Sequence, residues 1–145
     1  MEHKLYISLG SNQGNRKALI DEALRLIGLS VGRVERVSSM YETEPWGFNS
    51  VHKFLNAAAL VLTTLSPREC LTETQRIERK LGRRKKSKDG KYHDRPIDID
   101  LLLYDDWVIN TPELTIPHPL MEQRDFVKLP LAEIRTEELK SSPTT

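Results

Sequence analysis

The sequence predicts an α+β domain in which two helices cover an antiparallel sheet, and three observations predict it. Short apolar segments alternate with two amphipathic ones in the order βαββαβ. The second amphipathic segment carries both start and stop signals of a helix. The 145 residues suit one ordinary domain, with no internal repeat and no low-complexity linker. We therefore expect a ferredoxin-like sandwich over residues 1–140 and a flexible C-terminal tail over 141–145.

The first half of the chain predicts a strand, a turn, a helix and two further strands. Residues 4–9 alternate as a strand, and a turn over 10–15 precedes a segment with apolar residues at helical spacing. Residues 34–41 and 54–62 are predicted strands. The segment between them, 42–53, has no period and contains Pro and Gly, so it predicts a long loop.

The second helix has the clearest signals. Ser66 is a suitable N-cap, Pro67 takes the first helical position, and Glu69 completes a capping box. The apolar period continues until Gly82, which is a natural stop. The single cysteine, Cys70, lies in this helix, where we expect it to pack in the core and not to bind a metal.

The last third contains a strong strand between less regular segments. Residues 83–96 are basic and aperiodic, and residues 97–104 form an apolar strand. Residues 109–116 are expected to add edge strands, and 119–134 further helix.

Composition excludes several classes of protein. Twenty-two Lys and Arg against twenty-one Asp and Glu leave a net charge of +1, which is too small to attract nucleic acid or a membrane surface. Apolar runs such as 57–62 are far shorter than the roughly twenty residues that span a bilayer, and the polar start is no signal peptide. We therefore expect a cytoplasmic protein. Because no long apolar surface stripe is left unassigned, we expect it to be a monomer.

Two carboxylates stand inside the last predicted strand. The two-residue period of a strand places Asp98 and Asp100 on one face, about 6.5 Å apart along the backbone. Such hard oxygen ligands suit Mg²⁺, which takes one or two carboxylates together with substrate phosphates. The alternative is an edge strand with a solvated polar face.

A strongly basic segment precedes these carboxylates. Between Gly82 and Asp98 the sequence has seven cations and two acids. Cations next to a carboxylate pair suit phosphoryl-type transfer, since metal ions held by the carboxylates and basic side chains together neutralise the charge of a reacting polyphosphate. A solvated or nucleic-acid-binding run of charge is the alternative. The cations are Arg83, Arg84, Lys85, Lys86, Lys88, Lys91 and Arg95.

Further candidates are scattered along the chain. Aromatic rings at Trp46 and Phe54, with the amide of Asn56, are suited to a flat heterocycle, although such rings also anchor loops. The glycine-containing segment 10–14 lacks the Walker Lys-Ser/Thr and predicts only a tight turn. The remaining polar candidates, each also compatible with a structural role, are Gln75, Glu78, Thr115, His118 and Arg124.

Taken together, these segments resemble the 6-hydroxymethyl-7,8-dihydropterin pyrophosphokinase family. The resemblance runs from about residue 5 to 134. Each motif is short, but their order and spacing make the combination specific. The motifs are GSN at 10–12, YET at 41–43, FLN at 54–56, QRIE at 75–78, GR at 82–83, RPIDID at 95–100, IPHP at 116–119 and RDF at 124–126.

The resemblance implies that the hydroxymethyl oxygen of the pterin attacks the β-phosphorus of ATP, giving the pterin diphosphate and AMP in folate biosynthesis. It implies two Mg²⁺ ions held by Asp98 and Asp100, with ATP as co-substrate. The implied catalytic residues are Arg83, Arg95, Asp98 and Asp100. The implied pterin-binding residues are Thr43, Trp46, Phe54, Asn56 and Phe126. The implied ATP-binding residues are Gln75, Glu78, Lys91, Arg95, Ile99, Thr115, His118 and Arg124.

Two other functions use the same features. A non-catalytic ferredoxin-like module could bind RNA through its sheet and basic segment, although no strand has the aromatic-rich pattern of an RNA-recognition motif. A metal-dependent nuclease or nucleotidyltransferase could use the same carboxylates. It would show no dependence on a pterin.

Overall fold

A computed structural model of the chain describes residues 1–44, 53–82, 96–119 and 121–141, with side chains up to 135. None of the helices in these ranges is both long and apolar enough to cross a bilayer. The elements in chain order are β1 (His3–Ser11), α1 (Arg16–Ser30), β2 (Gly32–Val37), β3 (Tyr41–Thr43), β4 (Phe54–Thr63), α2 (Pro67–Lys80), β5 (Asp98–Tyr104), β6 (Ile109–Asn110), β7 (Thr115–Ile116) and α3 (Asp125–Ser141).

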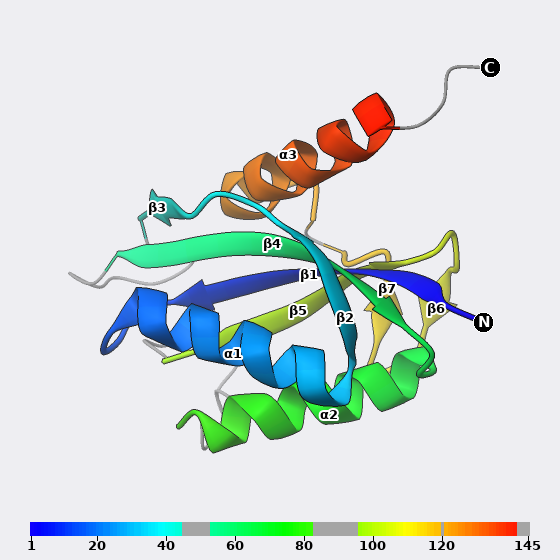
Figure 1. Cartoon of the computed structure of the whole chain (residues 1–145), viewed down its shortest axis with the longest axis horizontal. Coiled ribbons are helices and arrows are strands. Elements are labelled where there is room, and N and C mark those ends of the chain that lie inside the picture. Colours follow the sequence, from blue (N-terminus) through cyan, green and yellow to red (C-terminus); the bar gives the residue numbers. More distant parts are fainter. Residues whose placement is uncertain (45–52, 83–95, 120, 142–145) are drawn as a thin grey trace.

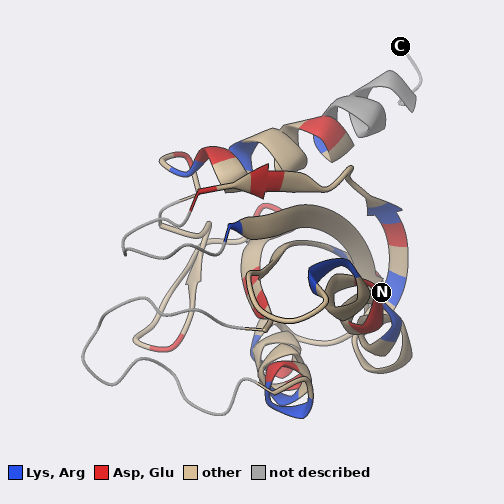
Figure 2. Cartoon of the chain, turned by 90° about the vertical axis from the view of Figure 1, so that its left-hand side faces the viewer, with Lys and Arg blue, Asp and Glu red and all other residues tan. Residues whose placement is uncertain are grey.

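The main sheet is antiparallel and forms the middle of three layers. Its strands follow the order β2-β4-β1-β5, and β3 also pairs with β4. Helices α1 and α2 cover one face and α3 covers the other (Figure 1). Viewed from the end that lies at the left of Figure 1, the sheet again lies between α3 above and α2 below (Figure 2). The predicted ferredoxin-like order and the two-helix face are confirmed, and α3 adds a layer.

Each face of the sheet has its own hydrophobic cluster. The cluster against α1 and α2 includes Leu9, Ile27 and Ile77, all at most 1% exposed. The cluster against α3 contains Tyr6, Ala58, Leu60, Leu102, Met121, Val127, Leu131 and Ile134. Residues 127, 131 and 134 of α3 recur at helical spacing, so one side of that helix packs on the sheet.

The predicted signals of α2 are present in the structure. Ser66 Oγ accepts a hydrogen bond from Glu69 N at 3.2 Å, and Glu69 Oε1 accepts one from Ser66 N at 2.9 Å. Gly82 follows the helix with φ +110°, a conformation that favours glycine. Cys70 is fully buried, and burial raises the pKa of its thiol to about 11, so it packs as a core residue as predicted.

The predicted strand over 34–41 is broken into two. Ser38 is buried between β2 and β3, and its Oγ accepts a hydrogen bond from Ala58 N at 2.9 Å. This side-chain bond takes the place of a backbone bond from the neighbouring strand, so regular pairing stops there. The predicted loop over 42–53 accordingly begins later, because β3 extends to Thr43.

Two other expectations need correction. Segments β6 and β7 pair with each other in a separate two-stranded sheet and add no edge to the main sheet. The predicted turn over 10–15 is shorter, because β1 runs through Ser11. Asn15 then caps α1, its side chain accepting a hydrogen bond from Ala18 N at 3.2 Å.

Candidate active site

The site is built on one row of residues that crosses three strands. Gly10 of β1 pairs with Asn56 of β4 on one side and with Asp98 of β5 on the other. Directly paired residues point to the same face of a sheet, so Asn56 and Asp98 share the face covered by α3. Two strand spacings separate their backbones by about 10 Å. Asp100 follows in the next row on this face, opposite Ser8.

Gly10 leaves room for two neighbouring side chains. A Cβ atom at this position would lie 3.0 Å from Asn56 Oδ1 and 3.5 Å from Phe54 Cδ1. The amide and the ring therefore lie over the glycine, and a Cβ at this position would press on the amide while meeting the ring at an ordinary contact distance. Sequence reasoning treated Gly10 as part of a turn and missed this role. A glycine inside a strand, which can mark close approach of another group, was the available signal.

Three of the predicted pterin-binding residues come together at this point. Asn56 is 2% exposed, and its Nδ2 donates hydrogen bonds to Thr43 Oγ1 at 2.7 Å and to Tyr41 O at 3.5 Å. Thr43 pairs with Phe54 across β3 and β4. The amide of Asn56 is thus fixed in direction by β3. Trp46, also predicted here, lies outside the described residues.

The first turn of α3 adds an aromatic ring and a cation on the same face. Phe126 is half-buried and packs against the α3-facing cluster. Arg124, just before the helix, is 6% exposed, and its Cζ lies 5.6 Å from the centre of the Phe126 ring. This distance is within the range of a cation–π contact, which ties the predicted nucleotide-binding arginine to the predicted pterin-binding ring.

His118 connects this region to the carboxylates. Its backbone N–H donates to Leu102 O at 3.0 Å, which places the segment against the outer edge of β5. Burial lowers the pKa of His118, the nearby charge of Arg124 lowers it further, and Asp98 opposes both. The lowered pKa favours the neutral imidazole, and the ring lies within electrostatic reach of both residues. Thr115, predicted beside it, lies in the small sheet as part of β7.

Two predicted ATP-binding residues contact each other. Glu78 Oε2, on α2, accepts a hydrogen bond from Ile99 N at 2.7 Å, and the Ile99 side chain is buried in the core against α1 and α2. The bond fixes the backbone between Asp98 and Asp100. Gln75 is half-buried on the same helix. The predicted residues Arg83, Lys91 and Arg95 lie outside the described residues.

The two carboxylates fit the expected metal by their chemistry. Asp98 and Asp100 are both half-buried and project from one face of β5, as predicted. Among the described residues, no group of three or more His, Cys, Asp or Glu side chains forms a protein-only cage. Mg²⁺ commonly binds through one or two carboxylates and completes its shell with phosphate oxygens and water. This donor set is therefore suited to a metal that arrives with a nucleotide.

Comparison with known proteins places the chain in a family. The family model described as 7,8-dihydro-6-hydroxymethylpterin-pyrophosphokinase (HPPK) matches residues 6–136. The chain belongs to this family. A Porphyromonas gingivalis 2-amino-4-hydroxy-6-hydroxymethyldihydropteridine pyrophosphokinase is 52% identical over 131 residues, covering 90% of this chain and 89% of the relative. The Bacillus subtilis protein of the same name is 42% identical over 135 residues, covering 92% and 79%.

Solved structures with the same fold include a two-part protein. The Plasmodium falciparum HPPK-DHPS structure with SDX-DHP superposes with a TM-score of 0.74 at 16% sequence identity. The superposition covers 92% of this chain and 41% of that one, so this HPPK-family chain spans about two fifths of the length of the solved chain. At this identity the likeness confirms the fold.

Gly10→Ala is expected to weaken pterin use specifically. The new Cβ would lie 3.0 Å from Asn56 Oδ1, and the amide is the more easily displaced partner because it ends a side chain. We expect KM for the pterin to rise about tenfold while KM for ATP stays within about twofold. Steady-state kinetics with each substrate varied in turn measures both values. An equal rise in the two would contradict a pterin-specific role for this row.

Proposed function

We propose that this chain transfers the pyrophosphoryl group of ATP to the hydroxymethyl group of 6-hydroxymethyl-7,8-dihydropterin, a step of folate biosynthesis. The observation that carries the proposal is the row Asn56–Gly10–Asp98. It places a buried amide and an aromatic ring at one end and a carboxylate at the other, on one face of the sheet. A flat heterocycle at the first end would direct its side-chain oxygen toward phosphates at the second.

The pterin end is formed by groups whose directions are fixed. Asn56 is held by Thr43 and can hydrogen-bond the edge of a heterocycle, while Phe54 and Phe126 supply rings from β4 and α3. Aromatic rings on both sides of a flat ligand stack with it and exclude water. Trp46 belongs to the same proposed set of pterin contacts.

The phosphate end is formed by Asp98 and Asp100, which we propose hold two Mg²⁺ ions. When bound there, Mg²⁺ neutralises charge on the polyphosphate and orients the attacking oxygen. The two carboxylates would bind the metal ions, and His118 and Arg124 would contact the nucleotide. The proposed phosphate-directed cations are Arg83, Lys91 and Arg95, which lie outside the described residues. Glu78 keeps the backbone between the two carboxylates in place through Ile99 N. Gln75 and Thr115 complete the proposed nucleotide contacts.

In the proposed reaction, the hydroxymethyl oxygen releases its proton to solvent and forms a bond to the β-phosphorus. The bond between that phosphorus and the oxygen bridging to the α-phosphate breaks, and AMP leaves. The protein contributes mainly position and electrostatic stabilisation.

We further propose that the chain acts as a single domain over 1–140 with a tail over 141–145. We place it in the cytoplasm, as a monomer that binds neither nucleic acid nor membranes.

The experiment that tests the function compares two acceptors. The chain is incubated with ATP, Mg²⁺ and either 6-hydroxymethyl-7,8-dihydropterin or 6-methyl-7,8-dihydropterin, which lacks the acceptor oxygen. Mass spectrometry should detect a pterin diphosphate in the first mixture and none in the second. An unmodified hydroxymethyl pterin after long incubation would contradict the proposal, and binding of single-stranded RNA would then favour the RNA-binding module.

A further inference from the structure

Strand β3 carries part of the site, although it is a short strand. It is three residues long, and within the described part of the chain its only strand partner is β4. It supplies Thr43 Oγ1 and Tyr41 O, the two acceptors that orient the amide of Asn56. Whatever fixes β3 therefore also fixes that amide.

A single carboxylate on α3 binds the start of β3. Glu133 Oε1 accepts a hydrogen bond from the Tyr41 hydroxyl at 2.6 Å. Its Oε2 accepts from Ser39 N at 2.8 Å and from Ser39 Oγ at 3.3 Å. The Tyr41 hydroxyl and the Ser39 groups hold the pKa of Glu133 below its ordinary value, and the same bond raises the pKa of Tyr41. Hydrogen bonds to an ionised acceptor are stronger than neutral ones.

The same helix carries the other wall of the site. Phe126 lies seven residues before Glu133, which is about two helical turns, so both lie on similar sides of α3. Arg36 of β2 also donates to Ile134 O at 3.4 Å, a second and longer link between this helix and the sheet. Glu133 thus connects the helix that carries Phe126 to the strand that orients Asn56.

On its opposite face β3 has a weaker attachment. Arg16 Nη2 contacts Glu42 Oε2 at 2.8 Å, with side chains 31% and 49% exposed. Water and salt screen such a pair, so it contributes little to holding the strand. The half-buried Tyr41 and Glu133 form the more effective attachment.

We propose that Glu133 is a positioning residue for the pterin. By holding Tyr41 and Ser39, it sets the separation between the Phe126 ring and the amide of Asn56, and so the width of the space for the heterocycle. This role rests on the proposed function. It involves no contact between Glu133 and the substrate, and it concerns the pterin and not ATP.

The test measures ligand binding by variants that keep the size of each side chain. Glu133→Gln has a single acceptor oxygen, which can face either Tyr41 or Ser39 while the amide NH₂ faces the other residue. Tyr41→Phe removes only the hydroxyl. Glu22→Gln, in an exposed pair with Arg25, is the matched control for the first. Tyr104→Phe is the control for the second, because its hydroxyl donates to Leu65 O at 2.8 Å far from the site.

Isothermal titration with the pterin, in the presence of Mg²⁺ and α,β-methylene-ATP, gives the Kd of the pterin. Titration with α,β-methylene-ATP gives the Kd of the nucleotide. We expect both Glu133→Gln and Tyr41→Phe to weaken pterin binding about tenfold and to leave nucleotide binding within about twofold. The double variant should lose less than the product of the two single effects. Both controls should bind like the wild-type chain, whatever their thermal stability.

Three results would overturn the proposal. If the wild-type chain binds the pterin and both variants bind it within twofold as well, the positioning role alone fails. The same holds if pterin and nucleotide Kd values rise together, because Glu133 would then support the fold in general. If the wild-type chain binds no pterin, the proposed function fails and this role fails with it.

Discussion

Asp98→Asn and Asp100→Asn should each lower kcat at least about a thousandfold while leaving the fold intact. Each substitution keeps the size of the side chain and removes the charge that a divalent cation requires. Both side chains are half-buried on the same face of β5, so loss of one charge also relieves repulsion between them. Thermal unfolding should therefore give a Tm no lower than that of the wild-type chain.

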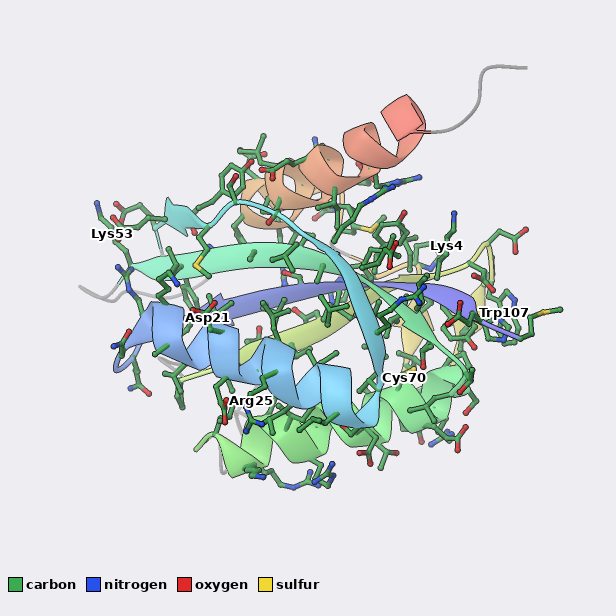
Figure 3. All side chains as sticks on the ribbon, in the orientation of Figure 1. Lys4, Asp21, Arg25, Lys53, Cys70 and Trp107 are labelled. Carbon is green, nitrogen blue, oxygen red and sulfur yellow. The ribbon has the colours of Figure 1, made fainter. Side chains whose placement is uncertain are left out.

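Asp21→Asn is the matched control for this pair. Asp21 lies on α1, on the other side of the sheet (Figure 3). It makes an exposed ion pair with Lys17. It should keep full activity. Full activity in both Asp98→Asn and Asp100→Asn would exclude the metal-binding role, whereas a loss in Asp21→Asn as well would point to a general effect of charge.

Gly32→Ala is expected to lower the free energy of unfolding by about 3 kcal/mol. A Cβ at this position would overlap Leu62 O and would lie 2.9 Å from the Cα of Thr63. Both contacts are with backbone, so β2 would have to move away from β4. Thr63 Oγ1 also donates to Val31 O at 2.6 Å, which leaves this corner little freedom to adjust.

Gly28→Ala should act in the opposite direction. Gly28 lies four residues earlier, near the end of α1, where a Cβ would meet no atom within 4 Å. Alanine loses less backbone freedom than glycine in a helix, so the free energy of unfolding should rise by about 0.5–1 kcal/mol. Urea unfolding followed by circular dichroism measures both changes. Equal effects of the two substitutions would contradict the close packing of β2 on β4.

The parts of the fold that were predicted correctly from the sequence depend on local interactions. Ser66 and Glu69 satisfy each other's backbone groups within one turn, so the start of α2 needs no tertiary contact. The strand that carries Asp98 and Asp100 was predicted for a similar reason, since alternation alone places both on one face. Their half-buried state and the alignment of Asp98 with Gly10 required the structure.

The parts that sequence did not predict depend on distant partners. The break at Ser38 exists because its hydroxyl bonds to Ala58 N, twenty residues away in the chain. The role of Gly10 depends on side chains from β4, and no local pattern shows which strand will lie beside it. The bond between Glu133 and Tyr41 joins residues 92 positions apart in the chain, so neither residue was a candidate.

The most direct test of the central claim is the identity of the nucleotide product. The purified chain is incubated with ATP, Mg²⁺ and 6-hydroxymethyl-7,8-dihydropterin, and the nucleotides are resolved by ion-exchange chromatography. Pyrophosphoryl transfer predicts AMP in a 1:1 ratio to the pterin diphosphate, and only when the pterin is present. Formation of ADP, or of AMP without any requirement for the pterin, would contradict the account.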